Sequence, residues 1–243
     1  CLSCANLLFL KLMITEAEFS ENLTAVRLEI EKACVQAGRS PDEVTLLPVT
    51  KNWPVEAVRY CHNANLTKVG ENRVQEAKLK MGSINGIEWE LIGHLQSNKV
   101  NQAIECFSRI QSVDSSKLLN RINHASNKRG LVTRILLQVN TGNDPAKFGV
   151  SAEDANLLME EALKLENLKV EGLMTVAPID STQNICPANA FSSLRILGEK
   201  LSNEFGVPLN ELSMGMSGDL KHAILEGSTV IRVGSSLFGS RKG

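Results

Sequence analysis

A lysine directly follows the first β-rich apolar run of the sequence. Lys51 comes after Val44–Thr50 and precedes Asn52, Trp53 and Pro54. A lysine held beside apolar surface can lose its charge through desolvation, and the neutral amine is the form that attacks a carbonyl carbon to make a Schiff base. A surface lysine that lays its stem over apolar residues would give the same local pattern. Position alone leaves both interpretations of Lys51 open.

Two turns of small residues later in the sequence have the composition of a phosphate site. Small residues before a helix leave backbone N–H groups without acceptors at the positive end of the helix dipole, where anions bind. Ser217 alone could be a helix cap, and Gly234 alone a turn residue, but the two turns together favour a phosphate. The turns are Ser213-Met-Gly-Met-Ser-Gly-Asp219, with Gly215, Ser217 and Gly218 as candidate contacts, and Gly234-Ser235-Ser236.

Two further polar residues fall within or directly after apolar runs. Arg232 lies within Thr229–Gly234, and a buried guanidinium needs a partner. It therefore either donates to a ligand or closes an internal salt bridge, and both interpretations stay open. His94 has Gln96 and Ser97 beside it and no second metal-binding side chain near it in the sequence. We expect His94 to support the site by hydrogen bonding.

The cysteines indicate a reducing compartment rather than a metal site. Cys1 and Cys4 have the spacing of half a zinc site, but no second CxxC or HxxxH pair follows them. The six cysteines are scattered through a chain that is too long to need a disulfide framework, and we expect no secretory signal. We expect a cytoplasmic protein without a bound metal.

Composition and charge exclude two classes of partner. Of the 243 residues, 43% are hydrophobic and 22% are charged, which is typical of a globular protein with one large core. Twenty-six Lys and Arg residues against 27 Asp and Glu residues leave no basic excess for a nucleic-acid backbone. The apolar stretch Leu7–Ile14 is interrupted by Lys11 and is far shorter than the roughly 20 residues that span a bilayer. We expect neither a nucleic-acid nor a membrane partner.

Eight short β-rich runs alternate with helical patterns along the chain. This alternation predicts an all-parallel sheet with right-handed crossovers, and eight is the number of strands at which such a sheet closes into a (β/α)8 barrel. An open doubly wound sheet is the second choice, because the GxGxxG turn expected after its first strand is absent. The predicted strands are 44–50, 66–70, 88–93, 110–113, 132–139, 169–176, 210–215 and 229–234, and the predicted helices between them are 54–64, 72–82, 97–106, 115–128, 151–166, 188–205 and 218–226.

An additional helix precedes the first strand. Apolar residues recur at intervals of three and four between Thr15 and Gly38, and Thr15 and Glu18 have the spacing of a capping box. We expect residues 1–14 to be a disordered or appended segment. Residues 15–243 are then a single barrel domain, in which the carboxyl ends of the strands build the site.

One cofactor suits a lysine after the first strand and a phosphate site after the seventh and eighth strands. Pyridoxal 5′-phosphate (PLP) has an aldehyde at one end and a phosphate at the other. A Schiff-base aldolase that acts on a phosphorylated sugar would use the same two features. A visible absorption band would distinguish the PLP protein from the aldolase.

The sequence resembles the pyridoxal phosphate homeostasis protein family in seven segments. They cover the chain from about residue 16 to Arg241 in the order found in the family. The segments are Leu47-Pro-Val-Thr-Lys51, Gly70-Glu-Asn-Arg-Val-Gln-Glu76, Ile92-Gly-His-Leu-Gln-Ser-Asn-Lys99, Leu137-Gln-Val-Asn140, Gly172-Leu-Met-Thr175, Ser213-Met-Gly-Met-Ser217 and Gly227-Ser-Thr-Val-Ile-Arg-Val-Gly234.

This resemblance implies a fold and a set of cofactor contacts. The fold is a single barrel similar to the PLP domain of alanine racemase (fold type III), without the β domain of that enzyme. The implied contacts are an internal aldimine on Lys51, phosphate bonds from Ser213, Ser217, Gly234 and Ser235, a bond from Arg232 to the pyridine nitrogen, Asn72 beside the ring and Met174 in the pocket wall. An arginine at the pyridine nitrogen disfavours its protonation and weakens the ring as an electron sink.

This sequence departs from the common family pattern at two places. Asn52-Trp53-Pro54 replaces the usual Thr-Lys-Pro after the lysine, and Lys68-Val69 replaces a frequent His-Phe. Both changes concern the rim of the pocket and leave Lys51 in place.

The resemblance favours a non-catalytic, monomeric PLP carrier that acts in intracellular PLP homeostasis. Such a carrier stores or delivers PLP, with apo forms of PLP enzymes as possible partners, and thereby affects amino-acid and keto-acid metabolism. The alternative is a PLP-dependent amino-acid racemase. Racemisation by two bases needs a second acid/base group opposite the lysine, which alanine racemases take from a tyrosine of an additional domain. We expect no such domain in a chain of this length, and its one tyrosine, Tyr60, falls in a helical pattern.

Overall fold

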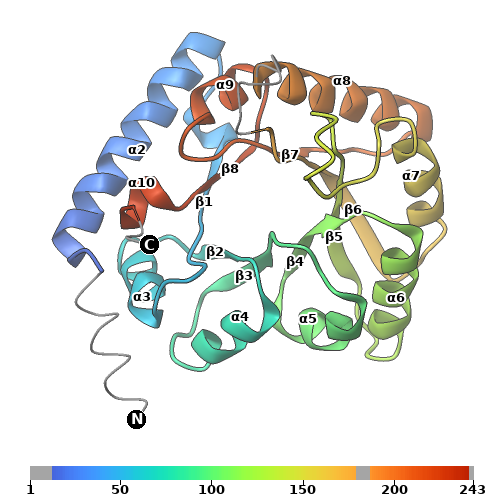
Figure 1. The fold of residues 1–243 in the computed structure, drawn as a ribbon, viewed down its shortest axis with the longest axis horizontal. Coiled ribbons are helices and arrows are strands. Elements are labelled where there is room, and N and C mark those ends of the chain that lie inside the picture. Colours follow the sequence, from blue (N-terminus) through green and yellow to red (C-terminus); the bar gives the residue numbers. More distant parts are fainter. Residues whose placement is uncertain (1–12, 179–186, 241–243) are drawn as a thin grey trace.

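Eight parallel strands form the centre of the structure, and helices surround them (Figure 1). The structure, a computed structural model, describes residues 13–178 and 187–240. The strands are β1 Thr45–Pro48, β2 Lys68–Glu71, β3 Glu88–Leu91, β4 Arg109–Val113, β5 Thr133–Gln138, β6 Leu168–Met174, β7 Glu211–Ser213 and β8 Val230–Val233.

One helix follows each of the eight strands within the described residues. Between β3 and α5 and before β1 lie two short 3-10 turns, η2 Ser97–Lys99 and η1 Pro41–Glu43. The helices are α2 Glu16–Ala37, α3 Val55–Asn63, α4 Val74–Met81, α5 Val100–Cys106, α6 Ser116–Asn127, α7 Ala155–Leu163, α8 Pro187–Phe205, α9 Leu220–Leu225 and α10 Ser235–Phe238.

The sheet closes into a barrel because β1 contacts β8 on one side and β2 on the other. The strand order is β1-β8-β7-β6-β5-β4-β3-β2, and every pairing in it is parallel. A parallel bridge between Val49 and Gly70 joins β1 to β2, and the Thr50 N–H donates to the Gly70 carbonyl at 3.0 Å. The predicted (β/α)8 barrel is therefore confirmed, and the open doubly wound sheet is wrong.

Several elements are shorter than the sequence pattern predicts. The register shifts between Ile110 and Val113 on β4 and between Ile135 and Leu136 on β5. Such bulges bend a strand, which a small barrel requires, and they interrupt the regular hydrogen-bond ladder. The predicted helix 218–226 begins only at Leu220, because a turn precedes it. The final helix α10 and the two 3-10 turns are too short to give a periodic pattern.

The predicted opening helix is confirmed with its caps. The Thr15 hydroxyl accepts from the Glu18 N–H, and the Glu18 carboxylate accepts from the Thr15 N–H, which makes the capping box. Gly38 ends the helix with φ 67°, a left-handed conformation that a side chain disfavours. Both ends of α2 are thus determined by residues next to it in the sequence.

The buried face of α2 packs against the last two helices of the chain (Figure 1). Phe19 is fully buried, and its ring stacks on that of Phe238 in α10 with centroids 5.4 Å apart. Leu23, Val26 and Ile30 continue this face along the helix. The helix therefore covers the side of the barrel where β1 and β8 pair.

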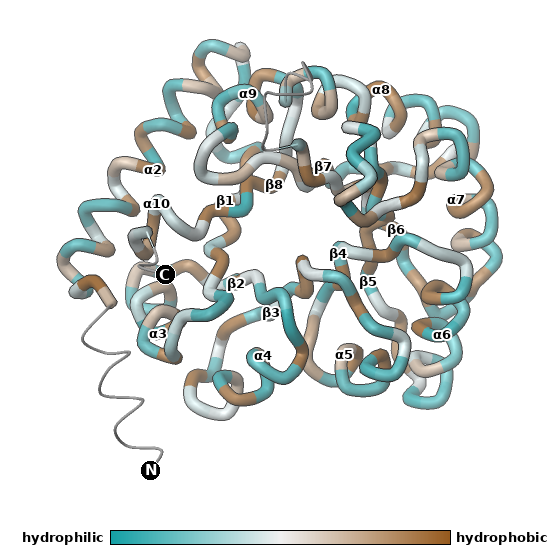
Figure 2. Tube along the Cα trace, in the orientation of Figure 1, coloured by the Kyte–Doolittle hydropathy of each residue, from teal (hydrophilic) through white to brown (hydrophobic). Residues whose placement is uncertain are grey.

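Apolar side chains fill the space between the strands and the helices. In Figure 2, hydrophobic residues recur along the strands and helices, with hydrophilic residues between them on the helices. One continuous core joins residues of every layer, from Phe19 in α2 to Phe238 in α10. No helix in residues 13–178 or 187–240 is both long enough and apolar enough to cross a bilayer.

Some predictions fall on residues outside the described part of the chain. These are the segment 1–12, with Cys1 and Cys4, and the positions Cys186 and Arg241. The other three cysteines, Cys34, Cys61 and Cys106, are buried free thiols. Burial raises the pKa of Cys61 to about 12, so this thiol stays protonated and unreactive at neutral pH.

We expect Phe19→Ala to lower the free energy of unfolding by about 3–5 kcal/mol, because it removes the ring that joins α2 to α10 and leaves a cavity. Val35→Ala on the exposed side of the same helix is the control, with an expected change within about 0.5 kcal/mol. Urea unfolding followed by circular dichroism measures both. Equal effects of the two substitutions would contradict the packing described for α2.

Candidate functional site

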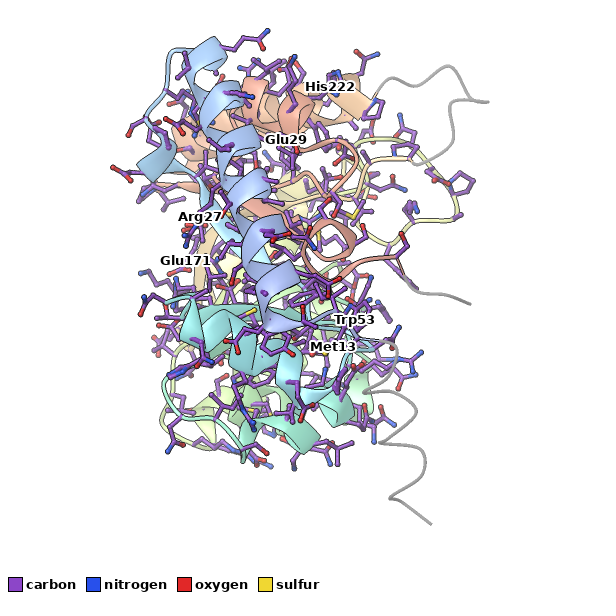
Figure 3. All side chains as sticks on the ribbon, turned by 90° about the vertical axis from the view of Figure 1, so that its left-hand side faces the viewer. Met13, Arg27, Glu29, Trp53, Glu171 and His222 are labelled. Atoms are coloured by element: carbon purple, nitrogen blue, oxygen red, sulfur yellow. The ribbon has the colours of Figure 1, made fainter. Side chains whose placement is uncertain are left out.

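A cavity of about 500 Å³ opens at the carboxyl ends of the strands. Figure 3 shows the barrel from the side, with Trp53 towards this end and Glu171 towards the other. The loops at this end carry the active sites of (β/α)8 enzymes. The residues that line the cavity are Val49, Lys51, Trp53, Ile92, Pro178, Pro187, Met216, Ser217, Gly218, Asp219, Arg232, Gly234, Ser235 and Gly239.

Lys51 reaches the cavity because β1 ends in a tight turn. The Trp53 N–H donates to the Thr50 carbonyl at 3.0 Å, and this bond closes the turn around Lys51. Asn52 has φ 61°, a left-handed conformation that asparagine tolerates better than most residues. The chain thus reverses within one residue of Lys51, and Lys51 becomes part of the cavity wall.

The two small-residue turns lie side by side, as the sequence predicts. The Ser236 N–H donates to the Ser217 hydroxyl at 3.3 Å, so the turn after β7 contacts the turn after β8 directly. The backbone N–H groups of Ser217, Gly218 and Ser235 have no acceptor among the described residues. A Cβ added to Gly218 would have no heavy atom within 4 Å, so open space lies beside this backbone. The paired turns can bind an anion of the size of a phosphate.

Arg232 is a buried cation in the wall of the cavity. Its Nη1 donates to the Ser213 hydroxyl at 2.7 Å, and its Nη2 donates to the Thr175 carbonyl at 2.8 Å. The remaining N–H groups of the guanidinium have no acceptor among the described residues. Burial lowers the pKa of Arg232 to about 10, although the charge of Asp219 opposes this shift. Arg232 is therefore charged at neutral pH and has donors available for a ligand.

A chain of polar contacts continues from Arg232 across the interior of the barrel. The Ser213 hydroxyl donates to Gln111 Oε1 at 2.6 Å, and Gln111 Nε2 donates to Glu90 at 2.5 Å. Arg109 binds Glu90 through two hydrogen bonds of 2.9 and 3.0 Å. Burial alone would lower the pKa of Arg109, but Glu90 and Glu211 raise it above its ordinary value. Each buried side chain in this series of contacts therefore has a hydrogen-bond partner, as buried polar groups require.

The structure brings some of the predicted site residues together and separates others. Ser213 is buried beneath Arg232, and Met174 is fully buried opposite it in the β6–β7 ladder. Gly215 has φ 93°, and a Cβ there would come within 2.5 Å of Ala223, so glycine is required for the backbone and the packing. These residues and Asn72 lie outside the cavity lining, and their contacts with a cofactor stay predictions. The predicted residues in the lining are Lys51, Ser217, Gly218, Arg232, Gly234 and Ser235.

Asn72 and His94 lie beside a neighbouring cavity of about 430 Å³. His94 Nδ1 lies 3.4 Å from the Asp114 carboxylate, and the imidazole stacks on the Phe148 ring with centroids 4.2 Å apart. This geometry fits the predicted supporting role of His94, at the rim rather than at Lys51.

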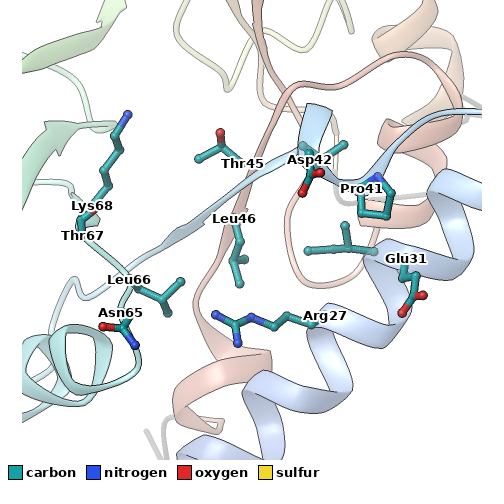
Figure 4. Close-up of a pocket in the computed structure, with 12 residues that line it drawn as sticks. Arg27, Glu31, Pro41, Asp42, Thr45, Leu46, Asn65, Leu66, Thr67 and Lys68 are labelled. Atoms are coloured by element: carbon teal, nitrogen blue, oxygen red, sulfur yellow. The ribbon is translucent and has the colours of Figure 1, made fainter.

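A further cavity, of about 640 Å³, opens at the opposite end of the barrel (Figure 4). It lies where β1 and β2 begin, and Thr45 and Lys68 line it together with Arg27, Glu31 and Asp42. Residues at the amino ends of barrel strands usually serve stability rather than chemistry. The cavity with Lys51 is therefore the candidate functional site.

Two residues of the site were not singled out as contacts from the sequence. Trp53 forms part of the wall and packs against Phe238 with ring centroids 6.0 Å apart. Asp219 accepts from the Met216 N–H at 2.5 Å and so closes the turn after β7. Its position two residues after Lys51 could have indicated that Trp53 lines the site. The contact of Asp219 depends on the shape of the turn, which the sequence does not show.

Known proteins are similar to this chain in sequence and in fold. Residues 22–242 match the family described as "Alanine racemase, N-terminal domain". The pyridoxal phosphate homeostasis protein of Aquifex aeolicus is 40% identical over 225 residues, which are 91% of this chain and 98% of that protein. The chain belongs to the pyridoxal phosphate homeostasis protein family. The resemblance found in the seven sequence segments is thus confirmed.

Solved structures of relatives agree with this assignment. The structure of PipY from Synechococcus elongatus with PLP bound has 35% sequence identity and a TM-score of 0.79, and the match covers 91% of this chain and all of PipY. Alanine racemase from Clostridium difficile has a TM-score of 0.76 at 15% identity and covers 93% of this chain but 58% of the racemase. The second likeness shows a shared barrel fold.

We expect Ser213→Ala to lower the free energy of unfolding by about 1–3 kcal/mol, because it leaves Arg232 Nη1 and Gln111 Oε1 buried without this partner. Ser83→Ala, at an exposed position after α4, is the control and should change little. Chemical denaturation measures both variants. A neutral Ser213→Ala would show that the interior network does not depend on this hydroxyl.

Proposed function

We propose that this chain binds PLP and acts as a PLP carrier in PLP homeostasis. One observation carries the proposal: Lys51, the guanidinium of Arg232 and the paired turns around Ser217 and Ser235 line a single cavity. The name of the relatives and the PLP in the PipY structure support the same ligand. When bound, PLP supplies an aldehyde that condenses with an amine and a ring that withdraws electrons.

The paired turns suit the phosphate end of PLP. Ser217, Gly218 and Ser235 offer backbone N–H groups that have no acceptor in the described part of the chain, and the open space beside Gly218 leaves room for phosphate oxygens. Hydrogen bonds from N–H groups to an ionised oxygen are stronger than those between neutral groups. We therefore assign the phosphate to these turns, with Gly234 at the start of the second one.

Arg232 suits the pyridine nitrogen of PLP. Its guanidinium is charged, buried and held by Ser213 and Thr175, so it stays fixed in the wall and still has N–H donors available. A guanidinium donates and does not accept, so it pairs with a pyridine nitrogen that carries no proton. An unprotonated ring is a weaker electron sink, which favours holding the cofactor over carbanion chemistry.

Lys51 suits the aldehyde of PLP. Its neutral amine would attack the aldehyde carbon, a C=N bond would form, and the aldehyde oxygen would leave as water with the two amine hydrogens. The bond is reversible by hydrolysis, so a carrier can release the cofactor. We propose that apo forms of PLP enzymes receive it.

The position of the one tyrosine bears on the racemase alternative. Tyr60 lies on α3 and packs against Phe19, with ring centroids 5.8 Å apart, outside the cavity lining. It therefore cannot provide the second acid/base group opposite Lys51. The carrier function needs no such group, which is why we prefer it.

We expect the purified protein to develop a visible absorption band with PLP, since Lys51 forms the Schiff base. Borohydride should remove the band, and mass spectrometry of the digested protein should find the reduced adduct on Lys51. Lys51→Ala should lack the band. Lys99→Ala, at the neighbouring cavity, should keep it as the control. A colourless wild-type protein, or an adduct only on other lysines, would overturn the assignment and reopen the aldolase reading.

We expect Gly218→Glu to weaken phosphate binding by about tenfold or more, because it places a carboxylate in the open space beside the paired turns. The probe is pyridoxine 5′-phosphate, which has the ring and the phosphate of PLP but an alcohol in place of the aldehyde. Gly82→Glu is the matched control, since a Cβ at Gly82 also meets open space but lies after α4. Calorimetry gives both affinities, and equal affinities would move the phosphate elsewhere.

A further inference from the structure

A buried lysine on α4 contacts the turn that contains Lys51. Lys80 is 6% exposed, and its Nζ donates to the Thr50 carbonyl at 2.8 Å. The same Nζ donates to Glu71 Oε1 at 2.7 Å and to Glu76 Oε1 at 2.9 Å. Glu71 and Glu76 belong to the Gly70–Glu76 segment, in which Asn72 is the predicted cofactor contact. We call Glu71, Lys80 and Glu76 the α4 clamp.

The α4 clamp binds the backbone on both sides of Lys51. On one side, Lys80 holds the Thr50 carbonyl, and the Thr50 hydroxyl donates to Glu71 Oε1 at 2.7 Å. On the other side, the Asn52 N–H donates to Glu76 Oε1. Lys51 is therefore the one residue between two anchored neighbours.

This anchoring matters because the turn has an unusual backbone. Asn52 is in the left-handed region, a conformation that costs free energy and persists where the surroundings hold it. The same Glu76 oxygen that holds the Asn52 N–H also accepts from Lys80. Loss of Lys80 would thus free the Thr50 carbonyl and remove the cation that holds the Glu76 carboxylate beside the Asn52 N–H.

Stability alone is a weak reason for these buried charges. The free energy of desolvating a buried ion pair is often as large as the attraction between its charges. Apolar residues of the same volume can therefore replace such a pair without loss of stability. Burial raises the pKa of the Glu71 carboxyl, Lys80 opposes this shift, and Glu71 Oε2 has no hydrogen-bond partner among the described residues. The charged side chains hydrogen-bond to the backbone groups beside Lys51, and apolar side chains could not do so.

We propose that Glu71, Lys80 and Glu76 are positioning residues that hold Lys51 in the geometry required for attack on the PLP aldehyde. The inference rests on the proposed function. A displacement of about 1 Å at a reacting atom can cost about a hundredfold in rate, so we expect release of the turn to slow formation of the C=N bond. The phosphate and ring contacts lie on other strands and are expected to persist.

The test compares two lysines in the last turn of the same helix. Lys80→Met removes the ammonium group of the α4 clamp and keeps the length of the side chain. Lys78→Met makes the same change at an exposed lysine. Stopped-flow absorbance measures the rate of Schiff-base formation with PLP, and calorimetry measures the affinity for pyridoxine 5′-phosphate. We expect Lys80→Met to slow the rate by about tenfold or more at unchanged affinity, and Lys78→Met to match the wild type.

A second pair of variants keeps the test decisive if Lys80→Met fails to fold. Glu76 is partly exposed, so Glu76→Ala should fold and should show the same slow rate. Glu76→Gln should be faster than Glu76→Ala, since the amide oxygen still accepts from the Asn52 N–H.

Each outcome has one meaning. Wild-type rates in Lys80→Met and Glu76→Ala would overturn the positioning role and leave the proposed function standing. An equal loss of rate and of affinity for pyridoxine 5′-phosphate would also overturn it, because the clamp would then support the whole site. A wild-type protein that forms no adduct on Lys51 would overturn the proposed function itself.

Discussion

The parallel pairing of β1 with β8 is the constraint on which the site depends. Leu47 lies opposite Arg232 in this ladder, and the Val49 N–H donates to the Val233 carbonyl at 2.8 Å. Lys51 follows the first of these strands and the second small-residue turn follows the other, so one pairing brings together residues from distant parts of the sequence. Each ladder bond contributes only about 1 kcal/mol net, and the helix α2 packed outside adds the apolar contact that secures the closure.

The interior of this barrel is partly polar, and that determines how Arg232 is held. In many barrels branched apolar residues fill the centre. Here the chain from Arg232 through Ser213 and Gln111 to Glu90 and Arg109 crosses it instead. Such a network gives little net stability, but each side chain in it has one orientation in which all of these hydrogen bonds form. The guanidinium is thereby fixed before a ligand arrives.

The sequence alone predicted the barrel and the end of the barrel at which the candidate site lies. Strands and helices alternate with clear periodicity, and carboxyl ends of parallel strands share one face, so Lys51, Ser217 and Ser235 could be placed together. The limits have physical causes. The resemblance implies a phosphate contact for Ser213, but no local pattern shows that its hydroxyl accepts a hydrogen bond from Arg232. The contacts of Lys80 join an α4 residue to a strand end, and no local pattern records them.

The contact of α2 with α10 has a consequence for synthesis of the protein. On the ribosome, Phe19 emerges long before Phe238, and β1 emerges long before β8, its partner in the ladder. Until then the first strand has an unpaired edge, and the ring of Phe19 lacks its contact with Phe238. Contacts between residues so far apart in the chain form late. A partly translated chain therefore lacks the wall of the cavity that β8 and the turn after it provide.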